Sequence, residues 1–138
     1  MVYIHKKTFD IVHHNLYHLD NVNEHNYAEV EKDYFIVDEL ISLPIQALNR
    51  KGYITLGCCA GHKYDYHCYQ TWIHFKERIS LPPLPLGWYI DDKFGYKKTD
   101  LAIRRKFDET LGTFKYLHDV LESMEQLYEW ALKLPEFK

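Results

Sequence analysis

The residues best suited to chemistry lie close together, between positions 58 and 74 of the 138-residue chain. This segment holds all three cysteines and three of the nine histidines. Within it, Cys59-Ala60-Gly61-His62 follows an apolar stretch, and glycine allows the chain to turn tightly with a left-handed backbone. Consecutive amides in such a turn can bind an anion. The pattern therefore predicts a turn that presents its backbone amides to a ligand, with the histidine at the rim.

Side chains from two expected strands extend this predicted site. Trp72 and His74 alternate along a strand, so they share a face that could stack a ring and contact an anion. Arg105 falls in an otherwise apolar row, where a cation needs an acid, carbonyl groups or a bound anion as its partner. The alternatives are a row packed beneath a helix and a strand that leaves the core at the arginine. The predicted ligand site comprises Cys59, Ala60, Gly61, His62, Trp72, His74 and Arg105.

A metal site and a nucleophilic thiol are the chemical alternatives for the same segment. Thiolates and imidazoles hold tetrahedral zinc, and the residues that would do so here are Cys59, His62, His67 and Cys68. Their spacing lacks the C-x-x-C pairs of a zinc module, so we expect neither a metal nor another cofactor. A nucleophilic cysteine would need a cation beside it to lower its pKa, for which His62 or Lys63 is available. An inert, reduced thiol is the simpler interpretation.

Strand alternation separates the two adjacent cysteines. In the expected strand 53–58, Ile54, Leu56 and Cys58 share one face, which we predict to be buried. A buried thiol behaves as a small apolar group, whereas a thiol at a turn is accessible to reagents and ligands. We therefore expect Cys58 to be structural and Cys59 to belong to the ligand site.

The elements that must position these residues follow from periodicity and from helix and strand breakers. Residues 3–19 are predicted to form one or two strands, and residues 33–38 a short buried strand. A short helix is predicted over about 43–51, because Pro44 suits a first turn and Gly52 suits the position after the last. Strands follow at 53–58 and 69–77. The proline-rich run 81–87 can be neither a helix nor an interior strand.

A hairpin and a long helix are predicted for the C-terminal half. Segments 88–91 and 100–107 have the pattern of two strands joined around Gly95. The helix, over about 113–134, carries an apolar stripe that we expect to face the core, made of Phe114, Leu117, Leu121, Met124, Tyr128 and Ala131. These elements predict a single α+β domain over residues 1–138, with a mostly antiparallel sheet, one short helix and one long C-terminal helix.

Composition narrows the function classes. A formal net charge of −3 argues against a general nucleic-acid binder, although six bases gather within residues 93–106. The chain contains no apolar run of about 18 residues and no signal-peptide pattern, which predicts a cytoplasmic protein that does not enter a membrane. Aromatic residues make up 16% of the chain, enough to supply a core, an interface or a stacking surface.

Two runs of sequence resemble a known group of proteins. The runs LNRKGYIT at 48–55 and CCAGH at 58–62 resemble the LNxKGYxT..CCxGH core of small uncharacterised proteins from Firmicutes and their phages. Further matches are WIHF at 72–75, PLPLGW at 83–88 and LYEWALKLPE at 127–136, so the resemblance spans nearly the whole chain. It implies a phage or Firmicutes setting and brings no established activity.

The turn at 59–62 also resembles the SxCSGR motif of the wybutosine-synthesis methyltransferase family, with histidine in place of arginine. That likeness spans one loop, and it implies SAM-dependent methylation of tRNA.

Three function classes follow from these observations. We expect first a binding protein, phage-encoded if the resemblance holds, that takes a small anionic or nucleotide-like ligand at the turn 59–62. The second class is an RNA- or nucleotide-modifying enzyme, methyltransferase-like, that uses the same loop. The third is a structural or interaction protein, or a zinc-binding module, whose aromatic surface would support a homo-oligomer.

Overall fold

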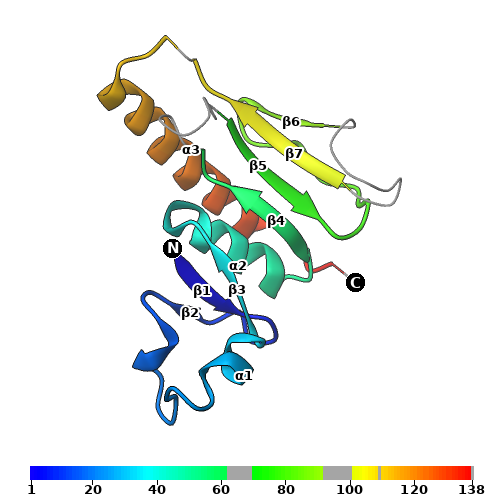
Figure 1. The fold of residues 1–138 in the computed structure, drawn as a ribbon. Coiled ribbons are helices and arrows are strands. Elements are labelled where there is room, and N and C mark those ends of the chain that lie inside the picture. The colour runs from blue at the N-terminus through cyan, green and yellow to red at the C-terminus, as the bar shows by residue number, and fades with distance from the viewer. Residues whose placement is uncertain (62–69, 92–100, 109, 138) are drawn as a thin grey trace.

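Two antiparallel sheets form the frame of the molecule (Figure 1). The computed structural model describes residues 1–61, 70–91, 101–108 and 110–137. The smaller sheet has the strand order β2 (Ile11–Val12), β1 (Val2–His5) and β3 (Tyr34–Val37). The larger sheet has the order β4 (Thr55–Cys59), β5 (Gln70–Phe75), β7 (Leu101–Lys106) and β6 (Trp88–Ile90). The α+β class and the antiparallel pairing predicted from the sequence are confirmed.

The helices pack between and against these sheets. Helical segments of the described chain are η1 (Leu16–His18), α1 (Tyr27–Glu31), η2 (Glu39–Ile41), α2 (Ser42–Arg50) and α3 (Thr113–Lys133). Helix α3 lies across one face of the larger sheet, and α2 lies between α3 and the smaller sheet (Figure 1). The predicted short and long helices are therefore confirmed, with ends that differ by one residue. None of the helices described here has the length and apolar character needed to cross a membrane.

One apolar core joins both sheets and both longer helices. Its buried members include Val2 and Ile4 from β1, Ile45 and Leu48 from α2, Ile73 and Phe75 from β5, Ile103 from β7, and Val120 and Leu127 from α3. The prolines of 81–87 form no regular element, as predicted. That segment passes α3, where Trp130 donates its indole N–H to the Pro83 carbonyl at 2.9 Å. The hairpin pairing of β6 with β7 is confirmed, and the expected turn around Gly95 lies outside the described residues.

The predicted buried row of β4 is wrong. Ile54 and Leu56 are 39% and 57% exposed, whereas Tyr53, assigned to the opposite face, is only 4% exposed. A β-bulge causes the difference, because the register shifts between Thr55 and Gly57. An extra residue in one strand resets the alternation of faces, which sequence periodicity alone does not reveal. Beyond the bulge Cys58 lies opposite the buried Ile73, so its inward placement is correct.

The predicted core stripe of α3 is wrong in its first half. Phe114, Leu117 and Leu121 are 90%, 44% and 53% exposed, respectively. The buried residues of the helix are Tyr116, Val120, Ser123, Met124, Leu127 and Ala131. Two apolar stripes therefore run along this helix, and only packing against the sheet decides which one is covered. Strand β3 also differs from prediction, because Val37 alone among its residues is buried.

Candidate functional site

The predicted turn adopts the expected backbone, but its two described amides already have acceptors. Gly61 has a φ of 95°, the left-handed conformation that glycine accepts readily. The Ala60 amide donates to Oδ2 of Asp38 at 3.1 Å, and the Gly61 amide donates to Sγ of Cys59 at 3.3 Å. A carboxylate of the chain itself thus takes the position expected for an anionic ligand. An external anion would have to displace Asp38.

The larger sheet divides the predicted site residues between its two faces. Cys59, Trp72 and Arg104 lie directly opposite one another on β4, β5 and β7, so they share one face. Arg105 lies opposite Thr71 and therefore faces the other side. The arginine beside Trp72 is Arg104, which donates to Asp91 at 2.8 Å and to Gln70 at 2.6 Å. The ring and the cation proposed to hold one ligand are not brought together.

Of the four remaining predicted residues, one is described and three are not. His74 shares the face of Trp72 and is 9% exposed. His62 lies outside the described residues, as do His67 and Cys68, so the zinc alternative falls largely on residues that the structure does not describe. Among the described residues, the cluster closest to a metal set is His118, Asp119 and Glu122 on α3, with ligand atoms within 4.8 Å. Lys115 already pairs with Asp119 at 2.9 Å and lowers the pKa of that carboxyl.

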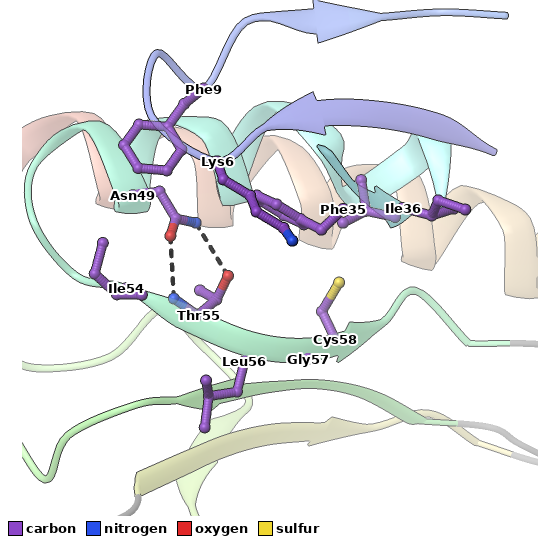
Figure 2. Close-up of a pocket in the computed structure, with 11 residues that line it drawn as sticks. Lys6, Phe9, Phe35, Ile36, Asn49, Ile54, Thr55, Leu56, Gly57 and Cys58 are labelled. Atoms are coloured by element: carbon purple, nitrogen blue, oxygen red, sulfur yellow. Dashed lines mark hydrogen bonds between the residues drawn. The ribbon is translucent and has the colours of Figure 1, made fainter. Parts of the chain in front are cut away.

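A concave site lies between the two sheets (Figure 2). Its volume is about 320 Å³. The turn after β1 contributes Lys6 and Phe9 to the lining, and the end of α2 contributes Asn49. Three more lining residues belong to β3, and five belong to β4 or immediately precede it. The full lining is Lys6, Phe9, Phe35, Ile36, Val37, Asn49, Ile54, Thr55, Leu56, Gly57 and Cys58. Apolar side chains form most of this wall, which is typical of small-molecule sites.

Asn49 fastens one end of the cavity. Its side chain is 3% exposed and makes three hydrogen bonds. Nδ2 donates to the Ile45 carbonyl at 2.8 Å and to the Thr55 hydroxyl at 3.0 Å, while Oδ1 accepts the Thr55 amide at 3.1 Å. The last two of these bonds are drawn in Figure 2. The first residue of β4 is therefore held to α2 by an amide group that uses both of its N–H donors and its carbonyl oxygen.

Phe9 contributes to the wall through an unusual backbone conformation. Its φ is 62°, in the left-handed region that bulky residues seldom occupy. The conformation is held from both sides, because the Phe9 amide donates to the His5 carbonyl at 3.0 Å and its carbonyl accepts from Nε2 of Gln46 at 2.9 Å. Strained residues of this kind are concentrated at ligand sites. The tight turn thus places an aromatic ring in the cavity wall.

The lining of the cavity carries one cation, and the carboxylate of Asp38, which is not part of the lining, acts on Cys58 at one end. Lys6 is the one charged side chain among the described lining residues, and its Nζ donates to the Lys32 carbonyl at 2.6 Å. In Figure 2 the Lys6 nitrogen and the Cys58 sulfur are directed into the same space. Burial, followed by the charge of Asp38, raises the pKa of the Cys58 thiol to about 12. At neutral pH this thiol is an uncharged part of the wall.

Sequence reasoning found one lining residue, Cys58, as an inward thiol and missed the cavity itself. The wall combines the turn after β1, strand β3 and the α2–β4 region, which are distant from one another in the sequence, and none of them carries a known ligand-binding motif. The one local signal was the Asn49-to-Gly52 helix end followed directly by a strand, which predicts a close approach of α2 to β4.

No protein-family model, curated protein or solved structure shows significant similarity to this chain. The resemblances to the Firmicutes and phage proteins and to the wybutosine-synthesis methyltransferases therefore stay predictions.

Proposed function

We propose that this chain is a binding protein for a small ligand with an apolar body and one anionic group, held in the cavity between the two sheets. The observation that supports the proposal is the cavity of about 320 Å³, whose wall is apolar except for a single cation and a few neutral polar groups. Ligand sites of this kind commonly occupy about 300–1,000 Å³. The ligand body would contact Phe9, Phe35 and Ile54, and its charged end would meet Lys6.

This proposal keeps the ligand class expected from the sequence and moves the site. A small anion remains the expected partner, but the amides of Ala60 and Gly61 are already engaged, whereas the Lys6 ammonium has donors left after its bond to Lys32. A nucleotide-like ligand fits less well than a compact amphipathic one, because the lining holds only one cation.

Binding is preferred to catalysis because the cavity thiol is not prepared for attack. A nucleophilic cysteine needs a lowered pKa, and that of Cys58 is raised to about 12. The methyltransferase-like alternative depends on the loop after Gly61, which lies outside the described residues. No observation on the described residues favours it over binding.

Calorimetric titration with octanoate, octylamine and 1-octanol tests this proposal, because the three probes share a chain and differ in charge. Octanoate should bind best. Lys6→Gln should weaken octanoate by about fivefold and leave 1-octanol unchanged, as expected for a partly exposed ion pair. Lys7→Gln is the matched control, because this neighbouring exposed lysine does not line the cavity.

Two cavity-filling variants locate the binding. Cys58→Phe should abolish octanoate binding. Ile54→Trp should also abolish it, and because Ile54 is 39% exposed, the larger side chain should be accommodated without loss of folding. Octanoate that binds both folded variants as well as the original protein would place the site elsewhere and refute the proposal.

A further inference from the structure

A row of hydrogen-bond donors crosses the inner face of the larger sheet, away from the cavity. Arg105 of β7 lies directly opposite Thr71 on β5 and Trp88 on β6. Residues directly opposite one another in antiparallel strands point to the same face, with Cβ atoms about 4.5–5.5 Å apart. The three side chains therefore lie next to one another on the face that α3 covers.

The indole N–H of Trp88 has no acceptor among the residues that the structure describes. Trp88 is only 7% exposed, and its Nε1 is a buried atom without a hydrogen-bond partner in the described part of the chain. The indole nitrogen can only donate, and a buried unsatisfied donor costs about 1–3 kcal/mol. In contrast, Trp130 satisfies its indole N–H on the Pro83 carbonyl. A ligand with an acceptor atom could satisfy the Trp88 indole N–H.

Arg105 is a half-buried cation for which the described residues supply no anion. Its guanidinium lies over the Phe107 ring, with Cζ 4.9 Å from the ring centroid, but within the described residues it has neither a carboxylate nor a carbonyl partner. The adjacent Arg104 shows the opposite situation, because it is paired with Asp91 and Gln70. A guanidinium has five N–H donors. An aromatic ring face does not replace the oxygen acceptors that these donors need.

The guanidinium of Arg105 is held in place before any ligand arrives. Gly87 has a φ of 85°, and a Cβ on this residue would lie 2.9 Å from Nε and 3.3 Å from Cζ of Arg105. The arginine thus packs directly on the glycine backbone, with Phe107 on the guanidinium as well. A preorganised planar cation loses less entropy when it binds an oxyanion.

We propose that Arg105 and Trp88 form a second binding site, for a small oxyanion of the phosphate type. Such a ligand has several acceptor oxygens, so it could take the forked donors of Arg105 and the indole N–H of Trp88 together. Thr71, third in the row, already donates its hydroxyl to the Ala60 carbonyl at 3.1 Å and connects this site to the turn after β4. This inference does not rest on the proposed function of the cavity.

Titration with inorganic phosphate and pyrophosphate, followed by two-dimensional NMR of the indole N–H signals, tests the inference. Trp88→Phe identifies the Trp88 signal by its loss, and that signal should shift on titration while the Trp130 signal stays in place. Arg105→Gln should weaken binding by about tenfold or more, as for loss of a charge-assisted, bidentate contact. Lys106→Gln is the matched control, since it removes a neighbouring exposed charge, and should change affinity less than about twofold.

Arg105→Lys keeps the inference testable if the glutamine variant does not fold. It preserves the charge and removes the fork, so binding should still weaken by about fivefold. A Trp88 signal that does not move, or equal losses in the Arg105→Gln and Lys106→Gln variants, would show diffuse attraction to surface charge and overturn the inference.

Discussion

Cys58 and Cys59 are neighbours in the sequence with different surroundings. The Cys58 side chain faces the cavity and the core, opposite Ile73, and its thiol has a pKa of about 12. The Cys59 side chain is on the other face, opposite Trp72, where its sulfur accepts the Gly61 amide. Both are half-buried, so the difference between them is one of face and electrostatics more than of exposure.

Thiol labelling should separate the two cysteines. In a variant that carries Cys59→Ser and Cys68→Ser, we expect Cys58 to react at least about a hundredfold more slowly than a free cysteine at about pH 8, because very little of it is thiolate. Its rate should keep rising toward about pH 12, whereas the rate of a free cysteine levels off about one pH unit above its pKa of about 8.5. The measurement is stopped-flow or mass-spectrometric labelling. The same variant in urea is the control, and an ordinary rate in the folded protein would contradict the raised pKa.

The amide of Asn49 should be worth more than the hydroxyl that it binds. Asn49→Ala leaves the Thr55 amide without its acceptor, and we expect a loss of about 2–3 kcal/mol in the free energy of unfolding. Thr55→Val removes only the hydroxyl contact and should cost about 1 kcal/mol. Urea unfolding of both variants measures the difference. Equal losses would mean that the amide is satisfied in another way once Asn49 is removed.

At the scale of elements, the positions of bulges and helix faces decide what is buried. The bulge in β4 brings Thr55 and Cys58 to the inner side and leaves Leu56 outward, so the cavity owes part of its wall to one inserted residue. Helix α3 turns its Tyr116, Val120 and Leu127 side inward, although the stripe through Leu117 and Leu121 is also apolar. The position of the bulge and the rotation of α3 both depend on contacts between elements.

Two leucines of α3 test which side of the helix is buried. Leu127 is fully buried and Leu121 is 53% exposed, yet both are leucines in the same helix. Leu127→Ala should lower the free energy of unfolding by about 2–5 kcal/mol, and Leu121→Ala by less than about 1 kcal/mol. Calorimetry or denaturant unfolding gives both values. A large loss for Leu121 would indicate that this exposed stripe is covered in solution.

At the scale of the whole molecule, the residues after α3 fasten the helix to the start of the larger sheet. The Phe137 amide donates to the Lys51 carbonyl at 2.8 Å, and the Tyr53 hydroxyl donates to the Pro135 carbonyl at 2.7 Å. The Lys51 ammonium also donates to the carbonyls of Leu132 and Leu134. The turn between α2 and β4 and the end of α3, about 80 residues apart, thus form one connection.

Gly52 lies where the residues after α3 approach the turn between α2 and β4 closely. Its φ is 93°, and an added Cβ would lie 2.9 Å from the Phe137 carbonyl oxygen. Gly52→Ala should therefore lower the free energy of unfolding by about 1–2 kcal/mol from backbone strain alone, and by more if the tail is displaced. Gly112→Ala is the matched control, because a Cβ there meets nothing within 4 Å. Thermal unfolding compares the two, and equal melting temperatures would contradict the close approach.

Local chemistry in the sequence was enough to predict the fold class, the two longer helices and most strands, but it did not predict α1 or the short helices η1 and η2. Pro44, Gly52 and Pro135 mark helix ends, and apolar alternation marks β5, because each of these signals acts through the backbone of its own segment. The left-handed backbone of Gly61, in the turn after β4, was also expected from the sequence.

Tertiary structure alone decided which residues meet. The cavity joins the turn after β1, β3, α2 and β4, and no segment among them carries its pattern. Trp72 and Arg105 were assigned to one ligand, but the register of β5 and β7 places them on opposite faces. Register, bulges and helix rotation are set by packing between segments far apart in the chain, and a shift of one residue moves a side chain to the other face of its sheet. For that reason most of the longer elements were predictable from the sequence, while the candidate site was not.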